Sequence, residues 1–209
     1  ARISSVSDLD KEHDTVLLAE VGEEATYVKH HPKKIAFIFS AMRHFARELE
    51  EKDIKVRYVR LTDKANTNSL KGEVKRAVKE LNPDRVVVTE AGEYRLLEDM
   101  KVWQKDLDVE VEIRDDDRFL ASHEDFSKWA KGRKTLRMEY FYREMRKKHQ
   151  ILLTQDDKPV GGDWNFDQDN RKKLPEDEDP PRIIHFQPDD TTKDVLKLVE
   201  SKFGDHFGD

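Results

Sequence analysis

The chain has 209 residues, 40% of them charged, and a formal net charge of −6 at pH 7. This length suits one domain of ordinary size, and the net charge argues against non-specific nucleic-acid binding by the chain as a whole, although a total conceals local patches. The absence of cysteine excludes disulfides, thiol catalysis and thiolate-bound metal clusters within these residues. Since no apolar run approaches the roughly 20 residues of a membrane span and no signal peptide is recognisable, we expect a cytoplasmic protein.

Short apolar segments alternate with amphipathic ones through the first half of the chain. The helical segments carry apolar residues at spacings of three and four; in the first helix these are Ile35, Ile38, Met42, Phe45, Ala46 and Leu49. Ser69 is a candidate N-cap for the second helix. The pattern predicts strands at residues 14–21, 54–61, 84–90 and 109–113, and helices at 33–53, 69–82 and 93–107.

Strands and helices in strict alternation predict an α/β fold. The expected form is a Rossmann-like, doubly wound parallel sheet with helices on both faces. Ligands of such sheets bind beyond the carboxyl ends of the strands, near the point where the strand order reverses. The candidate loops are therefore those after Val21, Leu61, Glu90 and Ile113.

The character of the chain changes after residue 113. Residues 115–153 read as helical, and residues 133–148 contain seven cations, two acids and three consecutive aromatics. Such a basic helix could follow phosphates, but Met138, Phe141 and Met145 at helical spacing favour an ordinary core face. A long irregular stretch follows, roughly residues 155–188, before a short amphipathic helix at 191–203. Irregular stretches of this length are functional loops or linkers.

Known catalytic and nucleotide-binding motifs are missing from the sequence. Neither GxGxxG nor GxxxxGK[ST] follows the first strand, and no Ser–His–Asp triad can be assembled. Glu20, Glu23 and Glu24 at the end of that strand suit either a solvated turn or a ligand site. From the residues alone, the prediction is a doubly wound domain that binds a planar or anionic ligand.

Four long segments carry a family resemblance. They are AEVGEEATYVKHHPKKIAFIFSAMRHFARELE, VVVTEAGEYR, RFLASHEDFSKWAKGRKTLRMEYFYREMR and PVGGDWNFDQDNRK. Together they resemble the amino-terminal part of the prokaryotic (6-4) photolyases, the iron–sulfur cryptochromes and photolyase-related proteins. The resemblance covers nearly the whole chain, in order.

The resemblance implies a light-driven DNA-repair enzyme, a DNA photolyase, of two domains. Residues 1–150 would form an antenna domain that binds 6,7-dimethyl-8-ribityllumazine, residues 151–191 an interdomain loop, and residues 192–209 the start of the connection to an all-helical domain. That second domain would hold FAD and a 4Fe–4S cluster and act on bases flipped out of damaged DNA. The helical domain and the family's opening strand are both missing from these residues, so we expect no catalytic residue in this chain.

The resemblance also implies site residues. Glu20, Glu24 and Tyr27 match the family's antenna segment, with Ile38 packing on the lumazine ring. Asp167 and Arg171 lie in the segment that faces DNA in the family: Arg171 could contact a phosphate, and Asp167 could accept a hydrogen bond from a base or hold a hydrated Mg²⁺.

Three alternatives remain open at this stage. The loop at residues 161–173 could be a solvated connection with one buried Trp. The whole protein could be a blue-light-sensing cryptochrome of the same family that signals through a protein partner. A stand-alone nucleotide-binding module of the universal-stress type is the third.

Overall fold

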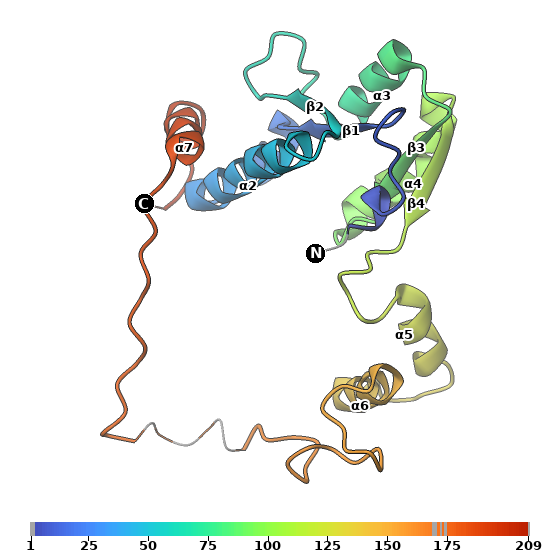
Figure 1. Cartoon of the computed structure of the whole chain (residues 1–209), viewed down its shortest axis with the longest axis vertical. Helices are drawn as coiled ribbons and strands as arrows, with labels where there is room; N and C mark the ends of the chain where they lie inside the picture. The colour runs from blue at the N-terminus through green and yellow to red at the C-terminus, as the bar shows by residue number, and fades with distance from the viewer. Residues whose placement is uncertain (1–2, 169–170, 172, 174, 209) are drawn as a thin grey trace. The chain divides into compact units, whose positions relative to one another are not determined.

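The computed structural model describes residues 3–168, 171, 173 and 175–208. The chain divides into two compact units. The first, here called the α/β unit, comprises Ser4–Arg114 and Phe186–Asp209, and the second, here called the helical unit, comprises Ala1–Ile3 and Asp115–His185. Figure 1 follows both along the chain.

The α/β unit contains four parallel strands and most of the helices. In chain order its elements are the 3₁₀ helix η1 (Ser4–Val6), β1 (Thr15–Ala19), α1 (Gly22–Thr26), α2 (Pro32–Glu50), β2 (Lys55–Val59), α3 (Leu70–Leu81), β3 (Arg85–Thr89), α4 (Tyr94–Leu107), β4 (Glu110–Arg114) and α7 (Asp190–Phe203). The predicted alternation of strand and helix is thus confirmed, and the class is α/β. One further helix, α1, lies between the first predicted strand and the first predicted helix.

The strands pair in parallel as β1–β2 and β3–β4. Thr15 is opposite Lys55 in the first pair, and Arg85 is opposite Glu110 in the second. Among the described residues no strand joins β1 to β3, so the two pairs form separate two-stranded sheets. Parallel pairing requires a crossover connection between neighbouring strands. Helix α2 lies in the connection from β1 to β2, and α4 lies in the connection from β3 to β4.

One apolar core joins α1, α2 and α7. Figure 1 shows α2 and α7 beside each other, although about 150 residues separate them in the sequence. The core consists of Ala25, Ile35, Ala36, Phe39, Val195, Val199 and Phe203. Side chains cap the amino-terminal ends of α7 and α2. Asp189 accepts a hydrogen bond from the amide of Thr192, and His31 accepts one from the amide of Lys33.

A second apolar core lies under α4. Met100, Trp103 and Leu107 are buried there, against partly buried side chains of α3, β3 and β4. The indole of Trp103 donates to Asp99 at 2.8 Å. Ser69 accepts a hydrogen bond from the amide of Gly72, which confirms it as the N-cap of α3.

The helical unit holds α5 (His123–Ala130) and α6 (Met138–His149). The sequence predicted helix across residues 115–153, but two separate helices form. The interruption has a local cause, because Gly132 adopts a positive φ of 77° and the chain leaves the helical path there. A complete capping box between Ser122 and Asp125 fixes the start of α5. In the described part of the chain, no helix has the length and apolar character needed to cross a membrane.

Candidate functional sites

Glu20 directly follows β1 and is fully buried, with 0% of its surface exposed. Its carboxylate accepts four hydrogen bonds: from Arg43 Nε at 2.6 Å and Nη2 at 3.1 Å, from the Tyr58 hydroxyl at 2.7 Å and from the Leu61 amide at 2.9 Å. Its backbone carbonyl accepts from the Asn66 side chain at 2.7 Å. The predicted ligand residue is therefore already saturated by protein donors.

The burial of this carboxylate affects its partners. Burial raises the pKa of Tyr58, and the hydrogen bond to Glu20 raises it further. For Arg43, burial alone would lower the pKa, but the hydrogen bond and charge of Glu20 outweigh burial and raise it. Both groups thus keep their protons, and Glu20 fixes the carboxyl ends of β1 and β2 against α2.

Glu24 and Tyr27 meet around an arginine that the sequence analysis did not single out. Arg95, in the first turn of α4, donates to both carboxylate oxygens of Glu24, at 3.1 and 2.6 Å. Its guanidinium carbon lies 4.4 Å from the centroid of the Tyr27 ring, within the range of a cation–π contact. The hydrogen bonds to Glu24, and then to Glu93, raise the pKa of Arg95. We call Glu24, Tyr27 and Arg95 the Arg95 cluster.

The Arg95 cluster contains an exposed aromatic ring. Tyr27 is 46% exposed, and Ile38 on α2 is 40% exposed. His30 packs edge-on against Tyr27, with ring centroids 5.0 Å apart. The cluster brings together the segments after β1 and β3, which the rule for ligands of parallel sheets had singled out. That rule, with Arg95 two residues after Glu93 in GEYR, was the signal that could have identified this arginine.

The second candidate site is the GGDWNF loop of the helical unit. Trp164 lies among three cations of α6: the distances from its ring centroid are 5.7 Å to Arg143 Cζ, 5.1 Å to Arg146 Cζ and 5.7 Å to Lys147 Nζ. Gly161 has a φ of 86°, and a Cβ added there would approach the ring of Phe166 to 3.0 Å. The two aromatics therefore attach the loop to its own unit, one to α6 and one to the turn.

One cation of α6 serves the structure of the helical unit. Arg146 is buried and donates to the carbonyls of Ile151 and Leu152, so it closes the end of the helix.

Phe141 is buried as predicted, whereas Met138 is exposed. The apolar face of α6 is therefore narrower than the spacing of its apolar residues suggested.

Asp167 and Arg171 are both exposed in the same loop. The amide of Asp167 donates to the Asn165 side chain at 2.7 Å, which forms a tight local turn. The amide of Arg171 donates to the carbonyl of Gln168 at 3.4 Å. Other residues of this motif, Asp169, Asn170 and Lys172, lie outside the described residues.

Among the side chains that the structure describes, no group of three or more His, Cys, Asp or Glu residues is arranged to hold a metal ion. Since the sequence has no cysteine, thiolate ligands for an iron–sulfur cluster cannot come from these residues.

The chain is thus an α/β protein with a charged, aromatic cluster beyond its strand ends and a second unit that contains a basic helix with aromatic residues. Residues 1–209 match the family model described as deoxyribodipyrimidine photo-lyase-related protein. The chain is also 50% identical over 206 residues to a (6-4) photolyase of Agrobacterium fabrum (strain C58 / ATCC 33970), a match that covers 99% of this chain and 40% of that relative. The chain therefore belongs to the photolyase-related family, and it spans well under half the length of this relative.

Proposed function

We propose that this chain is the antenna-binding, amino-terminal part of a light-dependent (6-4) photolyase that repairs damaged DNA. The observation that carries the proposal is the match along the whole chain to a (6-4) photolyase at 50% identity. In this proposal the complete protein is a DNA lyase, and FAD and a 4Fe–4S cluster are held outside these residues.

The proposed antenna is 6,7-dimethyl-8-ribityllumazine, and its site is the Arg95 cluster with Ile38. The residues fit such a group, because a planar heterocycle needs apolar surface for its rings and hydrogen-bonding groups for its polar edge. Half-exposed Tyr27 and Ile38 supply the first, and the Glu24 carboxylate, fixed by two hydrogen bonds from Arg95, supplies the second. Glu20 supports the site indirectly, because its hydrogen bonds hold the end of β1 in place. A bound chromophore would supply light absorption at this point.

The proposed DNA contacts are Asp167 and Arg171. Both side chains are exposed on a loop that Trp164 and Phe166 attach to the helical unit. Arg171 would contact a phosphate, which fixes the register of the duplex. Asp167 would accept a hydrogen bond from a base or hold a hydrated Mg²⁺ that bridges to the backbone.

The proposal is tested on the purified full-length protein. We expect a near-ultraviolet lumazine band together with blue flavin bands, and light-dependent reversal of (6-4) photoproducts in DNA. The double variant Glu24→Gln, Tyr27→Phe should lose lumazine while keeping flavin. Full lumazine occupancy in that variant would remove the chromophore from this site.

A cryptochrome of the same family, which signals through a protein partner, is the second candidate. It shares the family match and differs in having no repair activity. Flavin and lumazine bands without any light-dependent change in (6-4)-damaged DNA would favour it.

A further inference from the structure

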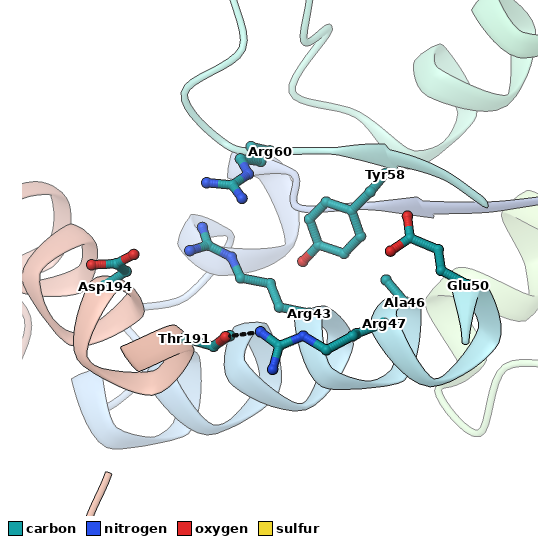
Figure 2. A pocket seen from close by; sticks show the side chains of 8 residues that line it. All are labelled: Arg43, Ala46, Arg47, Glu50, Tyr58, Arg60, Thr191 and Asp194. Atoms are coloured by element: carbon teal, nitrogen blue, oxygen red, sulfur yellow. Dashed lines mark hydrogen bonds between the residues drawn. The ribbon is translucent and has the colours of Figure 1, made fainter. Parts of the chain in front are cut away.

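A pocket lined by three arginines opens on the α/β unit, away from the Arg95 cluster. It encloses about 220 Å³ between α2, α7 and the end of β2. Figure 2 shows the side chains that line it: Arg43, Ala46, Arg47, Glu50, Tyr58, Arg60, Thr191 and Asp194. Since a water molecule takes about 30 Å³ in the liquid, the space suits a polyatomic ligand.

Two of the arginines are held in place by the protein. Arg43 donates to Glu20 through Nε and Nη2, so its Nη1 remains for another acceptor. Arg47, one helical turn further along α2, donates through Nη2 to the hydroxyl of Thr191 on α7. Both guanidinium groups are thus oriented before any ligand arrives, which lowers the entropic cost of binding one.

The third arginine of the pocket is Arg60, which follows β2 directly. Among the described residues, the Arg60 side chain has no hydrogen-bond or ion-pair partner, although it lines the same pocket as Arg43. Figure 2 shows the guanidinium groups of Arg43 and Arg60 directed into the same space, beside the Tyr58 ring. Like charges repel one another, so an anion placed between these two groups would be stabilised by both.

We propose that this pocket binds a phosphate-type oxyanion through Arg43, Arg47 and Arg60. Guanidinium groups present paired N–H donors that match the oxygens of a phosphate, and they form stronger, charge-assisted hydrogen bonds. Glu50 and Asp194 limit the affinity, because their carboxylates line the same pocket and repel an anion. The proposal does not depend on photolyase activity, since the pocket belongs to the α/β unit alone.

The test is calorimetric titration of the purified protein with inorganic phosphate, at constant ionic strength set with chloride. Arg60→Gln should weaken phosphate binding at least tenfold, and because the Arg60 side chain has no partner among the described residues the variant should fold normally. Lys64→Gln is the matched control: Lys64 is exposed, has the same charge and is near Arg60 in sequence, so its loss should leave the affinity unchanged. Asp194→Asn should tighten binding about two- to threefold.

A second arm of the experiment separates the sources of phosphate. If an undamaged thymidine decamer binds and loses affinity in Arg60→Gln as phosphate does, the ligand is a nucleic-acid backbone. If phosphate binds and the decamer does not compete with it, the ligand is a small phosphorylated molecule. Heat of binding no greater for phosphate than for chloride, or equal phosphate affinity in Arg60→Gln and Lys64→Gln, would overturn the proposal.

Discussion

Two carboxylates that follow β1 have different roles, because their surroundings differ. Glu20 is buried with four donors on its oxygens, whereas Glu24, four residues later, shares an exposed arginine. A buried carboxylate remains charged only while its partners are complete, because an unpaired charge in the interior is very costly. A partly exposed carboxylate such as that of Glu24 can accept further hydrogen bonds from a ligand. The two neighbours thus divide into a structural group and a proposed binding group.

Glu20→Gln should destabilise the α/β unit strongly. The change leaves the Arg43 guanidinium, only 10% exposed, without its counter-ion, and breaking such a pair costs about 3–5 kcal/mol. The measurement is the free energy of unfolding from urea titration. Glu48→Gln, which removes an exposed carboxylate paired with Lys52, is the control and should leave the unfolding midpoint nearly unchanged. Equal effects of the two changes would contradict the structural role of Glu20.

Arg95→Lys should reduce lumazine occupancy in the full-length protein while flavin content stays constant. Lysine keeps the charge, but it cannot donate two parallel hydrogen bonds to Glu24 or stack its planar group on Tyr27. The ratio of the lumazine band to the flavin band measures the effect. Lys101→Arg, at an exposed ion pair further along α4, is the control. Unchanged occupancy in Arg95→Lys would mean that Glu24 needs no orientation by this arginine.

At the scale of elements, α7 determines much that local sequence could not predict. Spacing alone placed Ile38 on the buried face of α2 and missed Phe39. In the structure Phe39 is buried against α7, and Ile38 is 40% exposed. A helix packed between a sheet and a second helix buries two adjacent stripes, and the second stripe depends on a partner about 150 residues away. By contrast, strand positions and the Ser69 cap depend on neighbouring residues, and the sequence predicted them.

The same limit explains the candidate sites. Sequence located Glu24 and Tyr27 through the loop after β1, but their contact with Arg95 depends on how β3 and α4 are placed in space. Trp164 lies in a charged loop, and its partners, the cations of α6, lie about 20 residues earlier in the chain. Motifs therefore identified the segments, whereas the contacts between them required the fold.

The contact between α2 and α7 should depend on pH through His44. Its Nδ1 lies 2.7 Å from the Ser40 carbonyl and its Nε2 lies 2.7 Å from Asp189, so both nitrogens face acceptors and the imidazolium form fits best. The hydrogen bond to Ser40, and then that to Asp189, raise the pKa of His44 above its usual 6.5. Its stabilising contribution is therefore complete below pH 6.5 and is lost as the pH rises through the raised value.

Thermal unfolding between pH 5.5 and 8.5 measures this contribution. The wild-type midpoint should fall relative to that of His44→Gln as the pH rises, by a modest amount because the pair is partly exposed. His13→Gln, at an exposed histidine far from α7 in the sequence, is the control and should run parallel to the wild type. If the unfolding midpoint of His44→Gln followed that of the wild type in parallel across this pH range, the result would contradict a protonated His44.

Trp164→Leu should release the GGDWNF loop from α6. The substitution keeps an apolar side chain but removes the ring that three cations contact, so the loop should open locally more often. Limited proteolysis within residues 161–168 should become several-fold faster, with the global unfolding midpoint little changed. Leu152→Ala, at an exposed apolar residue of the same unit, is the control. Unaltered cleavage would show that the ring does not hold the loop.

At the scale of the whole molecule, charge is distributed unevenly. The chain has 39 basic and 45 acidic residues, yet residues 133–148 contain seven cations and only two acids, and three of these cations surround Trp164. An overall negative charge repels nucleic acid at long range, so any DNA contact must come from such a local surface. That makes individual phosphate contacts measurable, because few cations are available to replace one that is lost.

Arg171→Ala in the full-length protein should weaken DNA binding and flatten its dependence on salt. Each phosphate neutralised on duplex DNA contributes about −0.9 to the slope of log K against log salt concentration, so losing one contact should change the slope by about that amount. Fluorescence anisotropy with a labelled duplex, measured across a salt series, gives the slope. Arg182→Ala, which removes an equal charge from another exposed position of the helical unit, is the control and should leave the slope unchanged. Asp167→Asn should reduce repair more than flavin photoreduction, since the proposed flavin site lies outside these residues. An unchanged slope in Arg171→Ala, together with unchanged repair in Asp167→Asn, would make this loop a structural connection.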